Sequence, residues 1–322
     1  MNITLLGCGR WGSFIAWYMD AVKHNNVMVW GRENDPLLDN LIKTRKNDYV
    51  EFPTSIQLTH DLTKALNHSD IIIISISAQG VRDLMSHISQ IPCYKNKTFV
   101  LCMKGIEDST GCRLSEVLIQ NGVQPDHIAV WVGPGHIQEF TRMVPNCMII
   151  DSYNSELTKY LVSEFSSNLI RFYMGCDIIG SEIGAAAKNV MGIGAGMLDG
   201  LGYSVLKGAL MARGAHEVSQ LIKAKGGNPL SAYGLCHLGD YEATLFSPHS
   251  HNRKFGEMFV KNEPFTKLAE GVATTSAMLK MAKQLNVELP ITQAIYNILH
   301  NSYTPQQILD ELFSRENKKE FD

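Results

Sequence analysis

The feature that most constrains the fold is a glycine pattern close to the amino terminus. Gly7, Gly9 and Gly12 form G-x-G-x-x-G, after a short apolar run at residues 3–6 and before a helical pattern at residues 11–23. In a strand–turn–helix unit, the first glycine permits a tight turn and the second lets the backbone approach a pyrophosphate. The third lets the helix pack closely on the strand, and the helix N-terminus favours an anion. The pattern therefore predicts a dinucleotide-binding unit, the alternative being a glycine-rich turn without a ligand.

Apolar runs typical of buried strands continue through the first half of the chain. The run at residues 70–75 is rich in isoleucine, as expected for a strand that is covered on both faces. Alternation of such runs with helical patterns predicts βαβ units and a parallel sheet. The further predicted strands are residues 27–30, 98–103, 128–132 and 147–150.

From about Ile179 onward, strand-like runs disappear and long helical patterns replace them. The helical stretches are residues 182–198, 203–225, 229–233, 273–285 and 292–301, with a tail helix after Pro305. We expect a Rossmann-type, doubly wound parallel sheet of the α/β class, followed by an all-helical C-terminal domain. The predicted division is a dinucleotide-binding domain at residues 1–178 and a helical substrate and catalytic domain at residues 179–322.

Composition narrows the classes of partner. The chain has 322 residues with 29 Lys and Arg against 32 Asp and Glu, a net charge of −3. This balance argues against nucleic acid or an anionic membrane as the main partner, although a local basic pocket is compatible with it. No apolar run approaches the ~20 residues of a membrane span, and no basic stretch precedes an apolar one at the N-terminus. The seven scattered cysteines lack C-x-x-C or zinc-finger spacing, so we expect a cytoplasmic protein without a metal site.

The end of the second predicted strand bears on the choice of cofactor. An NAD-selective site usually places Asp or Glu at this point, whereas Arg32 suits a 2′-phosphate or stacks on adenine. Glu33 follows directly and leaves the choice open. We expect NADP(H), NAD(H) or both, the alternative being that Arg32 is an ordinary solvated side chain.

Two lysines have positions that suit ligand binding or proton transfer. Lys104 follows a predicted strand at its carboxyl end, where open α/β sheets bind ligands. Lys188 lies in a helical stretch with glycines on the same flank, at Gly184, Gly192, Gly196 and Gly200. Because glycine costs about 1 kcal/mol relative to alanine inside a helix, this flank either packs against another backbone or faces a ligand. Burial would lower the pKa of Lys188 and suit it to proton exchange, the alternative being a lysine that reaches to solvent.

A third segment, at residues 234–240 and 247–256, is dense in polar, cationic and glycine residues. We predict a loop within the helical domain that could bind an anion such as phosphate. The alternative is an ordinary exposed loop.

Together these segments resemble the bacterial-type NAD(P)-dependent glycerol-3-phosphate dehydrogenase family, in order and over nearly the whole chain. The glycine pattern includes the family's Trp11, and Lys104 begins its K-G motif. In the first half, the family's other motifs are Gly31-Arg32 at a strand end, Q-x-x-R-D at residues 79–83 and the G-P turn at Gly133-Pro134. In the second half they are E-x-G-x-x-x-K-N-V at residues 182–190, a G-x-x-D-G-L-G type ending at 196–202, G-L-x-x-L-G-D at 234–240, S-x-N-R-x-F-G at 250–256 and E-G-V-x-T at 270–274.

The resemblance implies an oxidoreductase of glycerophospholipid biosynthesis that interconverts dihydroxyacetone phosphate and sn-glycerol 3-phosphate by hydride transfer with NAD(P)H. Lys188 would be the general acid/base, Lys104 would polarise or anchor this small-molecule substrate, and Asp240 would orient a substrate hydroxyl. A homodimer is also implied. Cofactor contacts are expected from Gly7, Gly9, Arg10, Trp11, Gly12, Arg32, Lys104, Ile137 and Glu270. Substrate contacts are expected from Lys104, Gly133, Gly135, Lys188, Asp240, Ser250, His251 and Asn252.

Two departures from the family pattern fall on the substrate side. His251 stands where most members have an arginine that grips the substrate phosphate, so that Arg253 or Lys254 would have to compensate. After the G-P turn, most members have a small polar residue and then Phe-Ala-Glu, whereas this chain has Gly135 followed by His-Ile-Gln-Glu. An alternative is therefore a dehydrogenase of the same family that acts on another small hydroxy or keto compound. A nucleotide sensor without turnover is disfavoured, because such a protein would not need the two lysines and Asp240.

Overall fold

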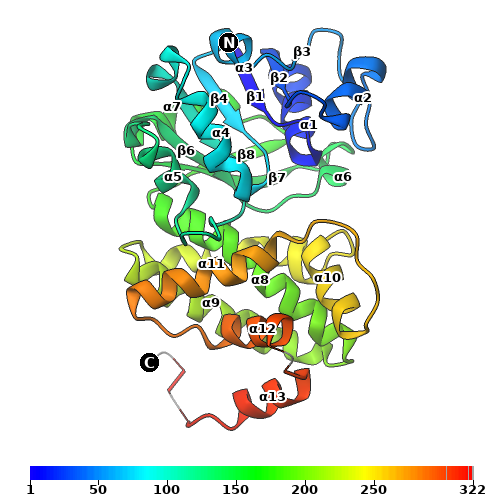
Figure 1. The fold of residues 1–322 in the computed structure, drawn as a ribbon, viewed down its shortest axis with the longest axis vertical. Helices are drawn as coiled ribbons and strands as arrows, with labels where there is room; N and C mark the ends of the chain where they lie inside the picture. Colours follow the sequence, from blue (N-terminus) through cyan, green and yellow to red (C-terminus); the bar gives the residue numbers. More distant parts are fainter. Residues whose placement is uncertain (302, 318, 321–322) are drawn as a thin grey trace. The chain divides into compact units, whose positions relative to one another are not determined.

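The computed structural model describes residues 1–301, 303–317 and 319–320. The chain forms two compact units (Figure 1). The first unit comprises Met1–Met103 and Leu114–Ile178, and the second comprises Lys104–Arg113 and Ile179–Asp322. The sequence-based division at residue 178 assigned Lys104–Arg113 to the first domain. In the structure, this segment belongs to the second unit.

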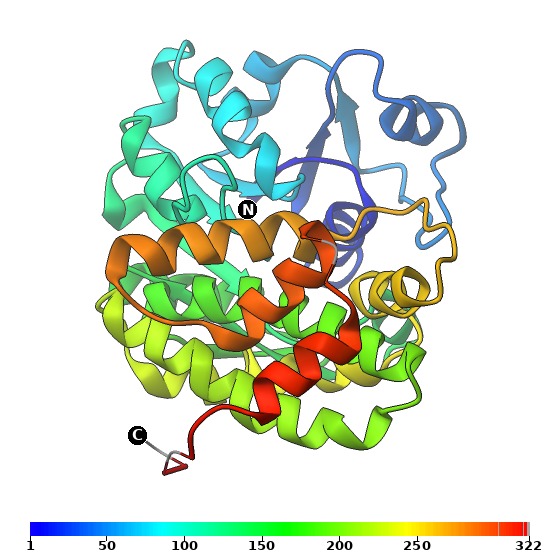
Figure 2. The same ribbon diagram turned by 60° about the horizontal axis from the view of Figure 1, so that its bottom comes forward.

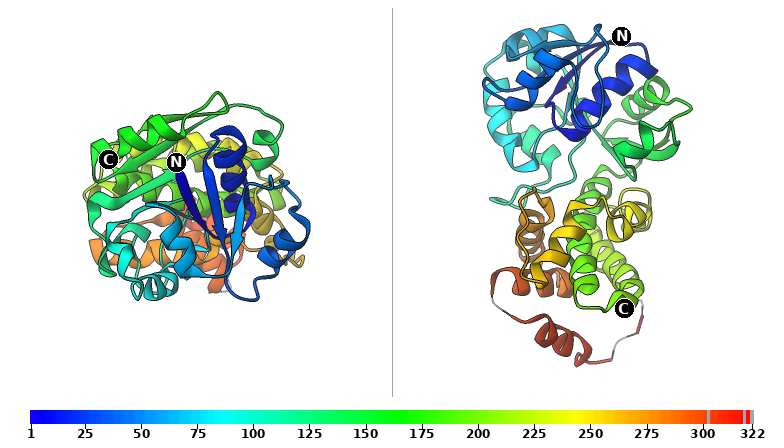
Figure 3. Two further views of the ribbon diagram at one scale, coloured as in Figure 1. Left: turned by 90° about the horizontal axis from the view of Figure 1, so that it is seen from above. Right: turned by 90° about the vertical axis from the view of Figure 1, so that its right-hand side faces the viewer.

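The first unit is built on an eight-stranded sheet with the order β3-β2-β1-β4-β5-β6-β7-β8. All neighbouring strands pair in parallel except β6 and β7, which confirms the Rossmann-type sheet; the blue N-terminal strands run side by side in Figure 3 (left). The strands are β1 (Asn2–Leu6), β2 (Asn26–Trp30), β3 (Gln57–Thr59), β4 (Ile71–Ile74), β5 (Thr98–Leu101), β6 (Ile128–Val132), β7 (Asn146–Ser152) and β8 (Ile170–Met174).

Three features of this sheet were not expected. Strands β3 and β8 at its two edges were missed, and β7 runs antiparallel to β6. The connection from β6 to β7 contains the four-residue helix α6 (Ile137–Phe140), which is too short to be the crossover helix of a parallel pair. In contrast, β4 is four consecutive isoleucines, all buried, as its sequence predicted for an interior parallel strand.

Short helices connect the strands of the first unit. The predicted helix at residues 11–23 is observed as α1, continued by a π-helical turn at Tyr18–Val22. The helices of this unit are α1 (Arg10–Trp17), α2 (Pro36–Thr44), α3 (Leu62–His68), α4 (Val81–Ile88), α5 (Leu114–Gln120), α6 and α7 (Ser155–Phe165).

The second unit is helical, as expected, and α8 (Ile178–Gly200) runs through its core. Ile183, Val190 and Met191 of α8 are completely buried, which agrees with a helix that is apolar around most of its circumference. Figure 2 shows α11 and α12 side by side in orange. The other helices are α9 (Lys207–Ala224), α10 (His251–Val260), α11 (Glu270–Leu285), α12 (Pro290–His300) and α13 (Pro305–Phe313). Among the described residues, no helix is long and apolar enough to cross a membrane.

The glycine flank of α8 packs directly on the backbone of α10. A Cβ atom added to Gly196 would lie 1.8 Å from the Arg253 carbonyl oxygen, and one added to Gly256 would lie 2.1 Å from the Ile193 carbonyl oxygen. No side chain fits at either position, so the two helices approach at backbone distance. Of the two explanations for the glycine spacing, close backbone packing is confirmed at this end of α8.

Candidate active site

The glycine turn between β1 and α1 has the geometry that a pyrophosphate requires. Gly7 has a φ of +110°, and a Cβ atom there would lie 2.3 Å from the Ser75 carbonyl oxygen. A Cβ atom on Gly12 would lie 2.3 Å from the Gly7 carbonyl oxygen, so α1 begins directly against the turn. At Gly9 an added Cβ atom would meet nothing within 4 Å, and no side chain caps α1. The turn is therefore closely packed at Gly7 and Gly12 and has open space at Gly9. This arrangement lets a cofactor phosphate approach the N-terminus of α1.

Three other predicted cofactor residues of the first unit are Arg10 and Trp11, which follow this turn, and Arg32, which follows strand β2. Arg10 is exposed, and Trp11 is half-buried with its ring centroid 5.2 Å from that of Phe14. Arg32 follows β2 and is exposed. Sequence analysis missed His60, whose Nδ1 lies 2.8 Å from the Arg32 carbonyl oxygen. This bond to the Arg32 carbonyl is the main reason that the pKa of His60 is raised.

The G-P turn of the first unit explains one departure from the family pattern. Gly133 has a φ of +126° and Gly135 a φ of +154°, and both conformations favour glycine. A Cβ atom on Gly135 would lie 2.4 Å from a ring carbon of Phe140. Ile137 begins α6 and is buried. The glycine at position 135 is therefore required by packing within the first unit.

In the second unit, three predicted catalytic residues meet around one carboxylate. Asp240 Oδ2 lies 2.7 Å from Lys104 Nζ and 2.9 Å from Lys188 Nζ. Asp240 ends the short 3-10 helix η7 (Leu238–Asp240), and Lys188 lies near the middle of α8. Asn189 Nδ2 donates to the Lys104 carbonyl oxygen at 2.8 Å, which holds the segment carrying Lys104 against α8. Two ammonium groups thus share one carboxylate oxygen.

Burial sets the electrostatics of this triad. The side chain of Asp240 is 1% exposed, that of Lys188 10% and that of Lys104 19%. Burial lowers the pKa of Lys188 to about 8; the Asp240 charge opposes this shift and the Lys104 charge adds to it. Asp240 Oδ1 is buried and has no hydrogen-bond partner among the described residues. The triad therefore combines a lysine that can lose its proton near neutral pH with a buried acceptor oxygen.

Thr244 is a site residue that sequence analysis missed. It lies on the π-helical turn η8 (Glu242–Phe246), and its Oγ1 accepts a hydrogen bond from Lys188 Nζ at 2.8 Å. Thr244 follows Asp240 by four residues, which places both side chains on one side of a helical turn. That spacing could have indicated Thr244 if the segment had been predicted to be helical.

The segment predicted to be a polar loop is in part a helix, so this prediction was wrong. Ser250 is the N-cap of α10, where its Oγ accepts from the Arg253 N–H at 3.3 Å, and His251 is the first helical residue. Asn252 Oδ1 accepts from the Gly271 N–H at 2.9 Å, which ties α10 to the first turn of α11, where Glu270 is the first residue. The predicted substrate residues Ser250, His251 and Asn252 thus share one helix terminus.

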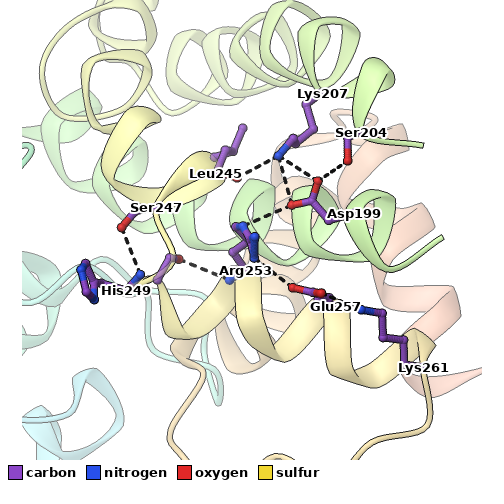
Figure 4. Close-up of polar contacts among 10 residues, drawn as sticks. Asp199, Ser204, Lys207, Leu245, Ser247, His249, Arg253, Glu257 and Lys261 are labelled. Atoms are coloured by element: carbon purple, nitrogen blue, oxygen red, sulfur yellow. Dashed lines mark hydrogen bonds and ion pairs between the residues drawn. The ribbon is translucent and has the colours of Figure 1, made fainter. Parts of the chain in front are cut away.

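The Arg253 side chain forms ion pairs with two carboxylates of the second unit, Asp199 and Glu257 (Figure 4). Its Nε lies 3.2 Å from Asp199 Oδ2, and its Nη1 lies 3.0 Å from Glu257 Oε2. Asp199 also pairs with Lys207 Nζ at 2.9 Å and accepts from Ser204 Oγ at 2.6 Å. Because its guanidinium holds α10 to the end of α8, Arg253 does not compensate for the missing arginine at position 251. Lys254 is exposed, so His251 is the cationic candidate nearest the start of α10.

No group of three or more His, Cys, Asp or Glu side chains in the part of the chain that the structure describes could hold a metal ion.

Two family models match the chain in succession. The model described as NAD-dependent glycerol-3-phosphate dehydrogenase N-terminus matches residues 2–158, and the corresponding C-terminus model matches residues 177–310. The glycerol-3-phosphate dehydrogenase (NAD(P)+) of Prosthecochloris aestuarii is 34% identical over 334 aligned positions, covering 99% of this chain and 100% of the relative. The enzyme of the same name from Enterococcus faecalis is also 34% identical and covers 99% of this chain and 97% of its own length.

A solved structure shows the same similarity. The crystal structure of glycerol-3-phosphate dehydrogenase from Coxiella burnetii superposes with a TM-score of 0.88 at 27% sequence identity, covering 98% of this chain and 99% of that chain. The similarity extends over both units, and these three relatives are all named glycerol-3-phosphate dehydrogenases. This agreement does not favour the alternative of a different small hydroxy or keto substrate.

Proposed function

Because this chain belongs to the NAD-dependent glycerol-3-phosphate dehydrogenase family, we propose that it interconverts dihydroxyacetone phosphate and sn-glycerol 3-phosphate with NADPH or NADH. The observation that carries the proposal is the buried Lys188, which pairs with Asp240 and Thr244 in a chain that matches the family over its full length. A nucleotide sensor would have no use for a buried, proton-donating lysine.

The proposed role of Lys188 follows from a count of its donors. An ammonium group has three N–H donors. Among the described residues, one is directed at Asp240 Oδ2 and another at Thr244 Oγ1, which leaves the third for a substrate oxygen. In ketone reduction, Lys188 donates its proton to the carbonyl oxygen as negative charge develops there. In alcohol oxidation, the neutral amine of Lys188 accepts the hydroxyl proton.

Lys104 and Asp240 maintain the charge balance during this proton transfer. When Lys188 gives up its proton, Lys104 remains as a cation 2.7 Å from the Asp240 carboxylate. The carboxylate is therefore never left buried without a counter-ion, which would be costly. We assign the second oxygen of Asp240, Oδ1, to a substrate hydroxyl, because that oxygen is buried and lacks a partner among the described residues.

The N-terminus of α10 is the proposed site for the substrate phosphate. Ser250, His251 and Asn252 lie in or directly before its first turn, where the helix dipole favours an anion. His251 supplies a full positive charge only when it is protonated. Glu270 begins α11, which Asn252 ties to α10, and we assign it to the cofactor side.

The cofactor fits the first unit at the β1–α1 turn. Gly9 offers open space at the uncapped start of α1, and Gly7 and Gly12 keep that turn compact. Arg10 and the exposed Arg32 are the proposed contacts for a phosphate and for a 2′-phosphate, respectively. When bound, the nicotinamide cofactor supplies the hydride for reduction at C2 of the substrate or accepts it in oxidation.

We also infer that residues 1–178 act mainly as the dinucleotide-binding domain and residues 179–322, with Lys104–Arg113, as the catalytic domain. A homodimer in the cytoplasm is part of the same proposal. It rests on the family resemblance and on the seven scattered cysteines, and analytical ultracentrifugation tests the dimer.

An isotope experiment tests the proposed reaction. Dihydroxyacetone phosphate is incubated with the protein and with NADPH that carries deuterium at the transferable position of the nicotinamide. We expect sn-glycerol 3-phosphate with one deuterium at C2, identified by mass spectrometry and NMR. Dihydroxyacetone, which lacks the phosphate, is the matched control and should react at least ~10-fold less efficiently. Unlabelled product or no product would contradict the proposal.

A further inference from the structure

His237 is a buried, titratable side chain next to the triad that has no role in the reaction described above. It is 0% exposed and lies between the 3-10 helix η6 (Pro229–Tyr233) and η7, which ends at Asp240. Its ring is bonded at both nitrogens. Nδ1 lies 2.9 Å from the Gly184 carbonyl oxygen, and Nε2 lies 2.7 Å from the Tyr241 hydroxyl oxygen.

These two contacts fix one tautomer of a neutral imidazole. A carbonyl oxygen can only accept, so Nδ1 carries the proton and donates it to Gly184. Nε2 then has the lone pair and accepts from the Tyr241 hydroxyl. Burial lowers the pKa of His237 to about 4, and the nearby Lys188 charge acts in the same direction while Asp240 opposes it. The imidazole therefore stays neutral over the range in which an enzyme of this kind is assayed.

The ring connects the two elements that carry Lys188 and Asp240. Gly184 precedes Lys188 by four residues, one turn of α8 on the same flank. On the other side, the Asp240 N–H donates to the His237 carbonyl oxygen at 2.9 Å. The buried His237 side chain therefore links the turn of α8 that precedes Lys188 to the backbone turn that carries Asp240.

The absence of a side chain at Gly184 makes this link sterically feasible. A Cβ atom at Gly184 would lie 2.8 Å from Cys236 Sγ and 3.1 Å from His237 Cβ. Gly184 thus lets the segment at Cys236 and His237 approach α8 closely enough for the hydrogen bond.

The Asp240 carboxylate depends on this backbone link. Its Oδ2 contacts two ammonium groups, and its Oδ1 has no hydrogen-bond partner among the described residues. No neutral donor therefore holds the carboxylate itself in orientation. Its position is determined by the turn at 237–240, and that turn is fastened to α8 through the His237 ring.

We propose that His237, held in its neutral tautomer by Tyr241, is a positioning residue that sets the Asp240 carboxylate against Lys188. The proposal rests on the proposed function, since it concerns the same triad. His237 faces the charges of Asp240 and Lys188, and Tyr241 is near the buried Glu217. If the link is lost, Asp240 is held less well against Lys188, so the pKa of Lys188 falls because the attraction of Asp240 normally raises it.

Two variants with side chains of similar size, His237→Leu and His237→Asn, distinguish a role in positioning Asp240 from a role in packing alone. His237→Leu removes both hydrogen bonds, whereas His237→Asn keeps a donor near the position of Nδ1. We expect His237→Leu to lower kcat for ketone reduction at least ~10-fold and to move the upper break of its pH profile down by ~0.5 unit or more. His237→Asn should retain kcat within ~3-fold, and neither variant should change cofactor affinity. An unchanged pH profile in folded His237→Leu protein would overturn the proposal.

Tyr241→Phe keeps the test decisive if His237→Leu does not fold. It removes only the hydroxyl that donates to Nε2, and the same downward shift, smaller in size, is expected. An unchanged profile in this variant would also overturn the proposal.

A measurement without turnover separates this inference from the proposed function. Competitive acetylation of Lys188, quantified by peptide mass spectrometry across pH, reports the pKa of Lys188 directly. A lower pKa in His237→Leu than in the wild type supports the positioning role, and an equal pKa contradicts it. Absence of wild-type turnover with dihydroxyacetone phosphate would contradict the function alone.

Discussion

Asp240 holds the Lys188 ammonium at 2.9 Å through Oδ2, while its other carboxylate oxygen has no hydrogen-bond partner among the described residues. The attraction keeps Lys188 charged in a buried site, and burial brings the pKa of Lys188 down to about 8. The relationship therefore gives Lys188 a proton that it can donate and regain near neutral pH.

Replacing Lys188 should remove the acid/base step and leave cofactor binding in place. We expect Lys188→Ala to lower kcat at least ~10²-fold, because a general acid contributes about that factor. The Kd for NADPH, measured by fluorescence titration, should stay within twofold. Lys283→Ala, which removes an exposed lysine of α11, is the control and should behave like the wild type. Normal turnover by Lys188→Ala would remove this residue from the mechanism.

The two directions of the reaction should depend on pH in opposite ways. Lys188 is protonated below its pKa of about 8, so kcat/KM for reduction should be level below that pH and fall above it. Oxidation needs the neutral amine and should rise through the same pH. In Asp240→Asn the attraction that raises the pKa of Lys188 is lost, so the break should move to lower pH. A break that stays in place in this variant would mean that another group titrates.

The close approach of α8 and α10 should make Gly196 intolerant of any side chain. A Cβ atom at that position would lie 1.8 Å from the Arg253 carbonyl oxygen, so Gly196→Ala should lower the thermal midpoint by at least ~5 °C. Gly208→Ala, on the exposed side of α9 with nothing within 4 Å of the added atom, should leave the midpoint unchanged or raise it. Circular dichroism melts measure both. Equal midpoints for the two variants would contradict the packing.

An arginine at position 251 should bind the substrate phosphate more tightly than His251 does. The guanidinium is permanently charged and can make two parallel hydrogen bonds to a phosphate. We therefore expect His251→Arg to lower the KM for dihydroxyacetone phosphate several-fold while the KM for NADPH is unchanged. Steady-state kinetics at pH 7.5 measure both constants. An unchanged or higher KM for dihydroxyacetone phosphate would favour a ligand without a phosphate at this position.

Local sequence was sufficient where one short pattern determines the structure. The glycines of the β1–α1 turn and the four isoleucines of β4 identify the sheet, since few other structures accommodate them. The family motifs located Lys104, Lys188 and Asp240, which the structure brings together.

Features that depend on distant partners were not visible in the sequence. Edge strand β8 carries exposed Arg171, Tyr173 and Met174, so its apolar run is too interrupted to stand out. Thr244 belongs to the site because it meets Lys188, a residue 56 positions away. The start of α10 was hidden by its polar residues, although Ser250 is an ordinary N-cap residue.

The most direct test of the account is the oxidation of NADPH and of NADH by the purified protein with dihydroxyacetone phosphate, followed by absorbance at the nicotinamide band. We predict robust turnover that requires both substrates, and Arg32→Ala should lower turnover with NADPH more than turnover with NADH. Tight cofactor binding without turnover, also across a panel of small keto compounds, would contradict the assignment of this chain as a dehydrogenase.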